Sequence, residues 1–137
     1  MGRYYHSFDD GGRHVDGNNT LGEDIADKGG LHVAYEAMLT YVAAHKSTPH
    51  LSAGRGGDTE ADGLVDEKRR FFEAWAQTWC HMSTPKMKRD ALLTDPHAPS
   101  RVRVNAALSQ FPPFRDTFQC PDSSKMAPPL RPQCSLW

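Results

Sequence analysis

Apolar residues recur at helical spacing in two long segments, and this pattern constrains the fold more than any other feature of the chain. The stronger segment carries a stripe made of Val65, Phe72, Trp75, Ala76 and Trp79. Three of these side chains are aromatic, and together they offer enough apolar area to anchor a core. We therefore expect a long helix here with one face buried.

A second helix is expected from Thr20 to about Ala44. Thr20 and Glu23 match the capping box, in which a hydroxyl and a carboxylate satisfy each other's free backbone donors. Gly29 and Gly30 either kink one helix or separate two. The apolar positions that follow the glycines at helical spacing are Leu31, Tyr35, Met38 and Val42.

Proline and polar residues mark the remaining boundaries. Pro at the first helical position predicts a shorter helix that follows Thr84 and runs to about Leu93, whereas the prolines of 95–99 require a loop. Ser100 is expected to cap a helix that ends near Leu108, and 114–118 to form a last turn. Strand patterns are scarce, so the predicted fold class is mainly α.

Three segments have the composition of irregular structure. Residues 1–19 are rich in Gly, Asp and Asn, and we expect an irregular leader there. Residues 45–63 are almost free of apolar side chains and predict a solvated, flexible loop. The Pro-rich tail from 121 to 137 is expected to be extended or irregular. Together with this tail, the domain is expected to occupy 20–137.

Composition excludes several classes of protein. A chain of 137 residues is long enough for one modest domain. Its net charge of -1 and isoelectric point near 6.6 argue against a nucleic-acid partner, which calls for clustered basic residues. No stretch approaches the roughly 20 apolar residues that cross a bilayer, and the start lacks the apolar core of a signal peptide. Taken literally, these features describe a cytosolic protein.

The cysteines point the other way. Cys80, Cys120 and Cys134 end apolar or proline-bounded segments, as cysteines of structural disulfides often do. Because three is an odd number, at least one has no partner within the chain. Two interpretations stay open, namely buried free thiols in a reducing compartment or a secreted protein whose partner cysteines lie outside the given sequence.

Two carboxylates, Glu23 and Asp27, stand four residues apart in the first predicted helix, which places both on one face. Such a pair can supply one metal ligand and one acceptor for a neighbouring histidine ligand. The simpler interpretation is a capping acid beside a surface acid. The sequence contains no His-Glu-x-x-His motif that would complete a zinc site.

A second group of candidate residues surrounds a proline-bounded loop. His97 lies between Pro96 and Pro99, two residues after Asp95 and six before Arg103. A carboxylate beside an imidazole fixes its tautomer and favours the protonated ring, which can donate to a developing oxyanion. The guanidinium of Arg103 offers a planar fork of donors suited to a carbonyl or carboxylate. Taken singly, His97 and Arg103 are equally consistent with ordinary surface residues.

Four ordered motifs resemble the C-terminal part of the neprilysin-type (M13) zinc metallopeptidases. They are Thr-Leu-Gly-Glu-Asp-Ile-Ala-Asp-Lys-Gly-Gly-Leu at 20–31, Phe-Phe-Glu-Ala-Trp-Ala-Gln-Thr-Trp-Cys at 71–80, Thr-Asp-Pro-His-Ala-Pro at 94–99 and the terminal Cys-Ser-Leu-Trp. The resemblance runs over nearly the whole chain, with a break at 45–63. It implies a largely helical fold that is the last portion of a longer ectodomain.

The resemblance also implies residue roles. Glu23 would be the third protein ligand of a zinc ion, beside two histidines of an upstream motif, and Asp27 would hydrogen-bond one of those histidines. His97, oriented by Asp95, would stabilise the oxyanion that forms on a peptide carbonyl during hydrolysis. Arg103 would hold a substrate backbone carbonyl. The general base would be a glutamate of the upstream motif.

The chain departs from the family pattern at several positions. Asp24 stands where the family usually has an Asn that helps to hold the peptide, and Asp accepts hydrogen bonds but cannot donate them. Ala106 and Gln110 replace the usual Gly and Asn. His6 precedes a Phe-Asp-Asp as a zinc histidine of the family does, although a simple loop from 5 to 17 is the favoured alignment.

Two functions follow from the resemblance. The first is the C-terminal part of a zinc-dependent endopeptidase that acts on peptides outside the cell or at the plasma membrane, inactive without its upstream part. There the upstream part would supply the zinc histidines and the partners of the three cysteines. The alternative is a catalytically inactive paralogue that serves as a binding or regulatory module. A third possibility, an unrelated helical interaction domain, would make the acidic residues caps and surface charges.

Overall fold

Helices form the architecture in the computed structural model, which describes residues 13–45 and 60–128, with the side chains of 60–62 left aside. Along those ranges the elements are α2 (Leu21–Ala44), α3 (Glu60–Thr78), α4 (Pro85–Thr94), α5 (Ser100–Ser109) and α6 (Pro112–Phe118). No β-strand occurs within them. The predicted mainly α fold class is confirmed.

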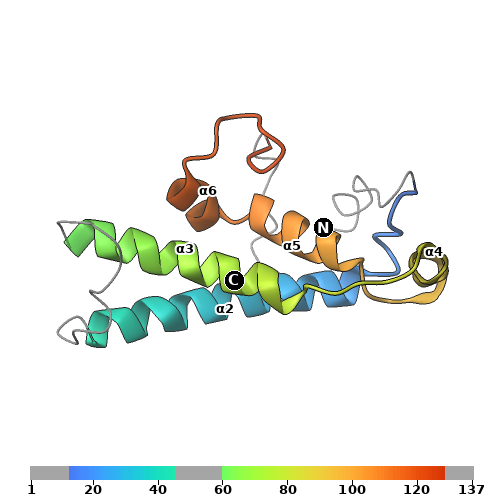
Figure 1. Ribbon diagram of the computed structural model, residues 1–137, viewed down its shortest axis with the longest axis horizontal. Helices are drawn as coiled ribbons and strands as arrows, with labels where there is room; N and C mark the ends of the chain where they lie inside the picture. Colours follow the sequence, from blue (N-terminus) through green and yellow to red (C-terminus); the bar gives the residue numbers. More distant parts are fainter. Residues whose placement is uncertain (1–12, 46–59, 129–137) are drawn as a thin grey trace.

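The two long helices run side by side in opposite directions (Figure 1). The shorter α5 packs against α2, and α6 packs against both α3 and α5. The first half of α2 therefore lies next to α5 and next to the end of α3 (Figure 1). This arrangement brings residues from distant parts of the sequence to one end of the helix pair.

An aromatic cluster holds α2, α3, α5 and α6 together. Phe72 of α3 is buried at its centre, where its ring stacks on Tyr35 with the centroids 5.5 Å apart. The rings of Phe111 and Phe114 meet Phe72 edge-on, at 6.1 and 5.3 Å. Edge-to-face and offset contacts of this kind add to the stability gained from burial alone. Of the stripe predicted from the sequence, Phe72 is thus a buried member of the main core and Trp75 packs against it.

A second, smaller apolar cluster supports the proline-bounded loop. It contains Val15 from the segment before α2, Ala98 from the loop, and Val102 and Ala106 from α5, with Leu92 of α4 packed against them. These contacts anchor the loop that carries His97 to α5 and to the chain before α2. The smaller cluster therefore fixes the position of the loop that carries His97.

The glycine pair does not divide the first predicted helix. Gly29 and Gly30 lie within α2, which is continuous from Leu21 and ends at the predicted Ala44. A Cβ atom built on Gly30 would meet nothing within 4 Å, so the residue faces open space. Of the two alternatives left open by the sequence, the single helix is correct.

Two of the predicted helix starts are confirmed or corrected by their caps. The hydroxyl of Thr84 accepts a hydrogen bond from the backbone N–H of Met87, as expected for the cap of α4. Ser100 was expected to cap α5 but is its first residue, and Pro99 occupies the cap position. The Ser100 hydroxyl instead contacts Nδ1 of His81 at 2.9 Å, which ties the α3–α4 connection to α5.

The loop predicted over 45–63 ends earlier than expected, because α3 begins at Glu60. The loop was inferred from polar composition. Acidic residues are also typical of the first helical turn, where they face the positive end of the helix dipole. Glu60 is the first residue of α3. The segment 46–59 lies outside the described residues.

Other predictions fall partly outside the described ranges. The proposed leader is described only from residue 13, so the alignment through His6 is not addressed, and neither is Cys134. Cys80 and Cys120 are both free thiols. None of the described helices has the length and apolar character needed to span a bilayer.

Replacing Phe72 with Ala should unfold the protein at markedly lower denaturant concentration. The substitution removes the ring at the centre of the aromatic cluster, and such changes cost about 3–5 kcal/mol. Urea unfolding followed by circular dichroism measures the loss. Phe118→Ala, at a partly exposed ring on the rim, is the matched control and should cost clearly less. Equal losses would contradict the central role of Phe72.

Candidate functional site

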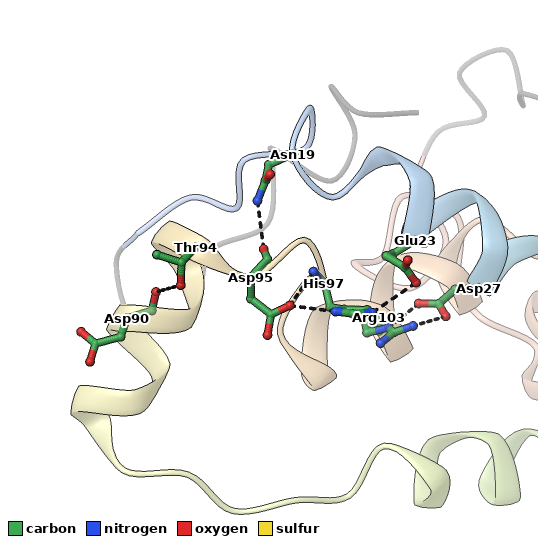
Figure 2. A network of polar contacts seen from close by, with 8 residues as sticks. All are labelled: Asn19, Glu23, Asp27, Asp90, Thr94, Asp95, His97 and Arg103. Carbon is green, nitrogen blue, oxygen red and sulfur yellow. Dashed lines mark hydrogen bonds and ion pairs between the residues drawn. The ribbon is translucent and has the colours of Figure 1, made fainter.

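Four of the predicted site residues converge where α2 and α5 meet. Glu23 and Asp27 come from the first two turns of α2, His97 from the loop before α5, and Arg103 from the first turn of α5 (Figure 2). Two contacts across this junction join residues about 75 positions apart in the sequence. The structure therefore brings the carboxylate pair and the proline-bounded loop together.

The first contact is an ion pair between Asp27 and Arg103. Nε and Nη2 of Arg103 each donate to one carboxylate oxygen of Asp27, both at 2.5 Å. The pair is largely withdrawn from solvent, with side-chain exposures of 13% for Arg103 and 6% for Asp27. Burial alone would lower the pKa of Arg103, but the hydrogen bonds and charge of Asp27 outweigh it and raise that pKa. Two parallel hydrogen bonds fix the orientation of the guanidinium.

The indole of Trp79 covers the same guanidinium. The central carbon of the Arg103 guanidinium lies 3.8 Å from the centroid of the Trp79 ring, a cation–π distance. Trp79 directly follows the end of α3, so this contact adds a third segment to the α2–α5 junction. Its position on the aromatic stripe suggested only a core role. The stacking was not predictable, because nothing in the sequence relates Trp79 to Arg103.

The second contact across the junction involves His97, which lies between two carboxylates. Nδ1 of His97 is 2.8 Å from Oδ1 of Asp95, and Nε2 is 3.3 Å from Oε2 of Glu23. The side chains of His97 and Glu23 remain partly open to solvent, at 44% and 42% exposure. An Nδ1–H directed at Asp95 leaves Nε2 as the nitrogen that faces Glu23 and the solvent.

Hydrogen bonds hold the His97 loop in place. Oδ1 of Asp95 also accepts the backbone N–H of His97 at 2.9 Å, and this bond, with the bond to the ring, lowers the pKa of Asp95. The carbonyl of Asp95 accepts a hydrogen bond from Nδ2 of Asn19, just before α2 (Figure 2). Asp95 thus contacts both the ring and the backbone of His97, and Asn19 is a support that the sequence did not suggest.

Asp24 has a different environment from its neighbours on α2. It has no exposed surface, and one of its oxygens accepts a hydrogen bond from the hydroxyl of Thr20 at 2.7 Å. The other oxygen has no hydrogen-bond partner within 13–45 and 60–128. Burial raises the pKa of Asp24 to about 6, although the Thr20 bond opposes the change. A peptide would reach this carboxyl only after a local rearrangement.

The same hydroxyl explains why the predicted capping box does not form. Thr20 occupies the N-cap position of α2, but its side chain accepts no backbone hydrogen bond there. Its hydroxyl proton goes to Asp24, one helical turn further on. A buried carboxyl needs a donor more than an exposed backbone N–H does, because water can satisfy the latter. Glu23 is thereby left free to face His97.

The residues at the junction suit one position of a metal site. A carboxylate oxygen is a ligand that Zn²⁺ accepts, and Glu23 carries its carboxylate partly exposed and beside an imidazole. Asp27 is less accessible, since both oxygens already bind Arg103. The described residues contain no cluster of three His, Cys, Asp or Glu side chains suited to a metal ion. Glu23 thus fits as a contributing ligand.

Removal of the guanidinium should destabilise the protein. Arg103→Ala leaves Asp27 as a buried, unpaired charge, and breaking such a pair costs about 3–5 kcal/mol. Urea unfolding at pH 7 measures this loss. The control is Arg70→Ala, which breaks an exposed pair with Glu67 and should cost less than about 1 kcal/mol. Similar losses for both variants would show that the Asp27 contact contributes no more than a surface pair.

Replacing Asp24 with Asn should change how stability depends on pH. The pKa of about 6 in the folded state exceeds the unfolded value of 3.8, so the protonated form stabilises the fold. That contribution is complete below about pH 4 and is lost as pH rises through 6. Asp24→Asn should therefore be more stable than the parent at pH 7, by up to about 3 kcal/mol, and similar to it at pH 4.

Urea unfolding of both proteins between pH 4 and 7 tests this expectation. The quantity to compare is the difference in unfolding free energy at each pH, since the other titrating groups are shared. Asp90→Asn, at an exposed carboxylate on α4, is the matched control and should show no such trend. A difference between Asp24→Asn and the parent that does not vary with pH would contradict the assigned environment.

Comparison of the sequence with known proteins identifies its family. The profile of peptidase family M13 matches residues 2–136. The chain is 39% identical to endothelin-converting enzyme 1 of Homo sapiens over 140 residues, which cover all of this chain and 16% of that protein. It is 37% identical to neprilysin-1 of Caenorhabditis elegans over 123 residues, covering 90% of this chain and 15% of the relative.

A third relative agrees with these two. Neprilysin of Oryctolagus cuniculus is 35% identical over 128 residues, which cover 93% of this chain and 16% of that protein. The chain therefore spans about a sixth of the length of these curated relatives. The match covers nearly every residue of the chain, including the whole α2–α5 junction. We conclude that this chain belongs to peptidase family M13.

Proposed function

We propose that this chain provides the C-terminal part of the catalytic domain of a zinc-dependent endopeptidase that hydrolyses peptides. One observation carries the proposal beyond family membership. Glu23, the expected zinc ligand, and His97, the expected oxyanion donor, face each other across a solvent-accessible junction. This contact supports a shared role for the two residues at one site, because it places the expected ligand and the expected donor within 3.3 Å of each other.

In this proposal Glu23 would hold the zinc together with two histidines from an upstream segment. Zinc, when bound, supplies Lewis-acid polarisation of the scissile carbonyl and activation of water. The 3.3 Å approach of His97 to Glu23 supports the proposal, because it places a second functional group next to the ligand position. Asp27 would orient one of the upstream histidines through the lone pairs that Arg103 leaves unused.

His97 would donate a hydrogen bond from Nε2 to the oxygen of the peptide carbonyl as negative charge develops there. Asp95 supports this role, because it accepts from Nδ1 and so directs Nε2 outward. The hydrogen bonds of Asp95 to the backbone of His97 and to Asn19 limit the movement of the ring. A donor held in place before reaction loses little free energy to reorganisation.

Arg103 would hold a backbone carbonyl of the substrate. Asp27 binds Nε and Nη2, so the remaining Nη1 edge is the part of the guanidinium that a carbonyl can approach. Stacking on Trp79 keeps the plane of the guanidinium fixed while it does so. A substrate contact at Asp24 belongs to the proposal only for a conformation in which Thr20 releases that carboxyl.

The partners in this proposal are peptide substrates and the upstream part of an M13 protein. That part would carry the two zinc histidines and the cysteines that pair with Cys80, Cys120 and Cys134. Such disulfides call for an oxidising compartment, and we propose an extracellular or plasma-membrane ectodomain. The net charge of -1 gives no support for a nucleic-acid partner.

A chimera tests the proposal. In it, this chain replaces the matching region of human endothelin-converting enzyme 1, which restores an upstream part from a relative 39% identical in that region. We expect one zinc ion per chimera by atomic emission and cleavage of a quenched fluorescent peptide. Glu23→Gln should weaken zinc affinity by more than about 100-fold, because a ligand contributes at least as much as its supporting groups. Glu36→Gln, also on α2, is the matched control.

Two results would overturn the proposal. One is full zinc occupancy in the Glu23→Gln chimera, which would remove Glu23 from the metal site. The other is a folded, zinc-loaded chimera without peptidase activity, which would favour the inactive binding module. The 137-residue chain alone should bind zinc weakly and cleave nothing, because one carboxylate cannot replace three protein ligands.

A further inference from the structure

A three-residue modification motif stands directly before α2. Asn18, Asn19 and Thr20 match the pattern Asn-x-Ser/Thr, in which x is any residue except Pro and the first asparagine accepts an N-linked glycan. The other two asparagines, Asn19 and Asn105, are followed two positions later by Leu and Ala, so the motif occurs once in the 137 residues. Because the pattern is short, its structural context decides whether the match is informative.

The side chain of Asn18 is available for the attachment of a large group. Residues 17–20 form a turn, and Asn18 is exposed within it. Its backbone N–H donates to Oδ1 of Asp16 at 3.0 Å, but its side-chain amide makes no hydrogen bond to any residue of 13–45 and 60–128. A glycan is bulky and needs a surface position. Attachment at this amide would displace no contact in the described part of the chain.

Local structure gives no other reason for an asparagine at position 18. Asparagine is favoured in turns because it tolerates a positive φ or because its side chain bonds to the nearby backbone. Within the described ranges the non-glycine residues of positive φ are Gln119 and Ser123, and the side-chain bonds of this turn come from Asp16. Asn19 differs from Asn18, since its side chain donates to the carbonyl of Asp95 (Figure 2).

We infer that Asn18 carries an N-linked glycan. The inference rests on the extracellular or plasma-membrane location in the proposed function, because such modification belongs to secreted proteins. Nδ2 of Asn18 would attack the anomeric carbon of an oligosaccharide that is linked to a lipid diphosphate. The bond from nitrogen to carbon forms as the bond from that carbon to the diphosphate oxygen breaks. The lipid diphosphate leaves with the electron pair, and one amide proton passes to a base.

The burial of Thr20 sets the order of glycan transfer and folding. The motif requires a hydroxyl two residues after the asparagine, so the transferring enzyme has to reach the side chain of Thr20. In the folded chain Thr20 is only 3% exposed, and its hydroxyl donates to Oδ2 of Asp24 at 2.7 Å. Transfer to Asn18 therefore precedes the folding of the first turn of α2. The hydroxyl serves recognition first and the buried carboxyl afterwards.

Translation of the chain in the presence of microsomes tests the transfer. A cleavable signal peptide brings the 137-residue chain into the lumen, and protection from added protease identifies the molecules that have entered. In these molecules we expect one shift in electrophoretic mobility, which peptide N-glycosidase reverses. Asn18→Gln should abolish the shift. Thr20→Ser, which keeps the hydroxyl, and Asn105→Gln, outside the motif, are the matched controls and should retain it.

Two results of this experiment would overturn the inference. One is an unshifted parent chain among the protected molecules, which would leave Thr20 with the single role of donor to Asp24. The other is a shift that persists in Asn18→Gln, which would place the modification elsewhere.

The order of events has a separate test. The folded chain, made in bacteria, and a synthetic peptide of residues 14–28 are each mixed with solubilised transferase and its lipid-linked oligosaccharide. The peptide contains the motif without the fold. It should accept the glycan at least about tenfold faster, because the folded chain must first open locally to expose Thr20. Equal rates would overturn the assigned order.

The chimera with human endothelin-converting enzyme 1 tests whether the folded domain keeps the glycan. Trypsin cuts after Arg13 and Lys28 and releases segment 14–28 from chimera that has been labelled at the cell surface. Removal of a glycan by peptide N-glycosidase turns the amide of Asn18 into a carboxylic acid, which mass spectrometry detects. We expect this conversion in most molecules, and in the Thr20→Ser chimera as well. An unconverted Asn18 in surface-labelled chimera would overturn the inference.

The outcome separates the inference from the proposed function. Glycan occupancy is measured without zinc or activity, and Asn18→Gln should leave the zinc stoichiometry of the chimera unchanged. A chimera with a glycan on Asn18 whose zinc affinity survives Glu23→Gln would retain the modification and reject the zinc ligand. A chimera that loses zinc with Glu23→Gln but carries an unmodified Asn18 would do the reverse.

Discussion

The buried ion pair of Asp27 and Arg103 is the constraint on which the rest of the site depends. It is the contact that ties α2 to α5 through side chains of opposite charge, and its two hydrogen bonds allow only one orientation of the guanidinium. The turn of α5 that carries Arg103 also sets where the chain leaves the preceding loop, and therefore where His97 lies relative to Glu23. The ring of Trp79 covers the face of the Arg103 guanidinium and links the ion pair to the end of α3.

Different apolar clusters stabilise the helix packing and position the residues of the candidate site. The aromatic cluster around Phe72 joins the long helices to α6 and needs no polar contact. The smaller cluster under Ala98 and Val102 supports the loop and the start of α5 instead. The polar groups at the junction are therefore positioned by elements whose packing rests on these two apolar clusters. This arrangement allows Asp24 and Asp27 to be buried on one helix, where each has found a different donor.

Local patterns predicted the helices well, because apolar spacing, Thr84 and Pro85 each act within a few residues. Even so, the Thr20 hydroxyl serves Asp24 instead of the capping box, because the burial of that carboxyl depends on tertiary packing. The resemblance selected Glu23, His97 and Arg103, but their mutual contacts span about 75 positions that no periodicity relates. The stacking of Trp79 and the support from Asn19 depend on packing in the same way.

The continuity of α2 through Gly29 and Gly30 has an evolutionary consequence. Glu23 and Asp27 stand near one end of this helix, and the connection toward α3 leaves from the other end, about 30 Å away at 1.5 Å per residue. Insertions or deletions in that connection thus occur far from the carboxylates and cannot shift their register. A change in length at this point alters the number of residues between the acidic pair and the histidine loop, but it leaves the four-residue spacing of Glu23 and Asp27 on α2 intact.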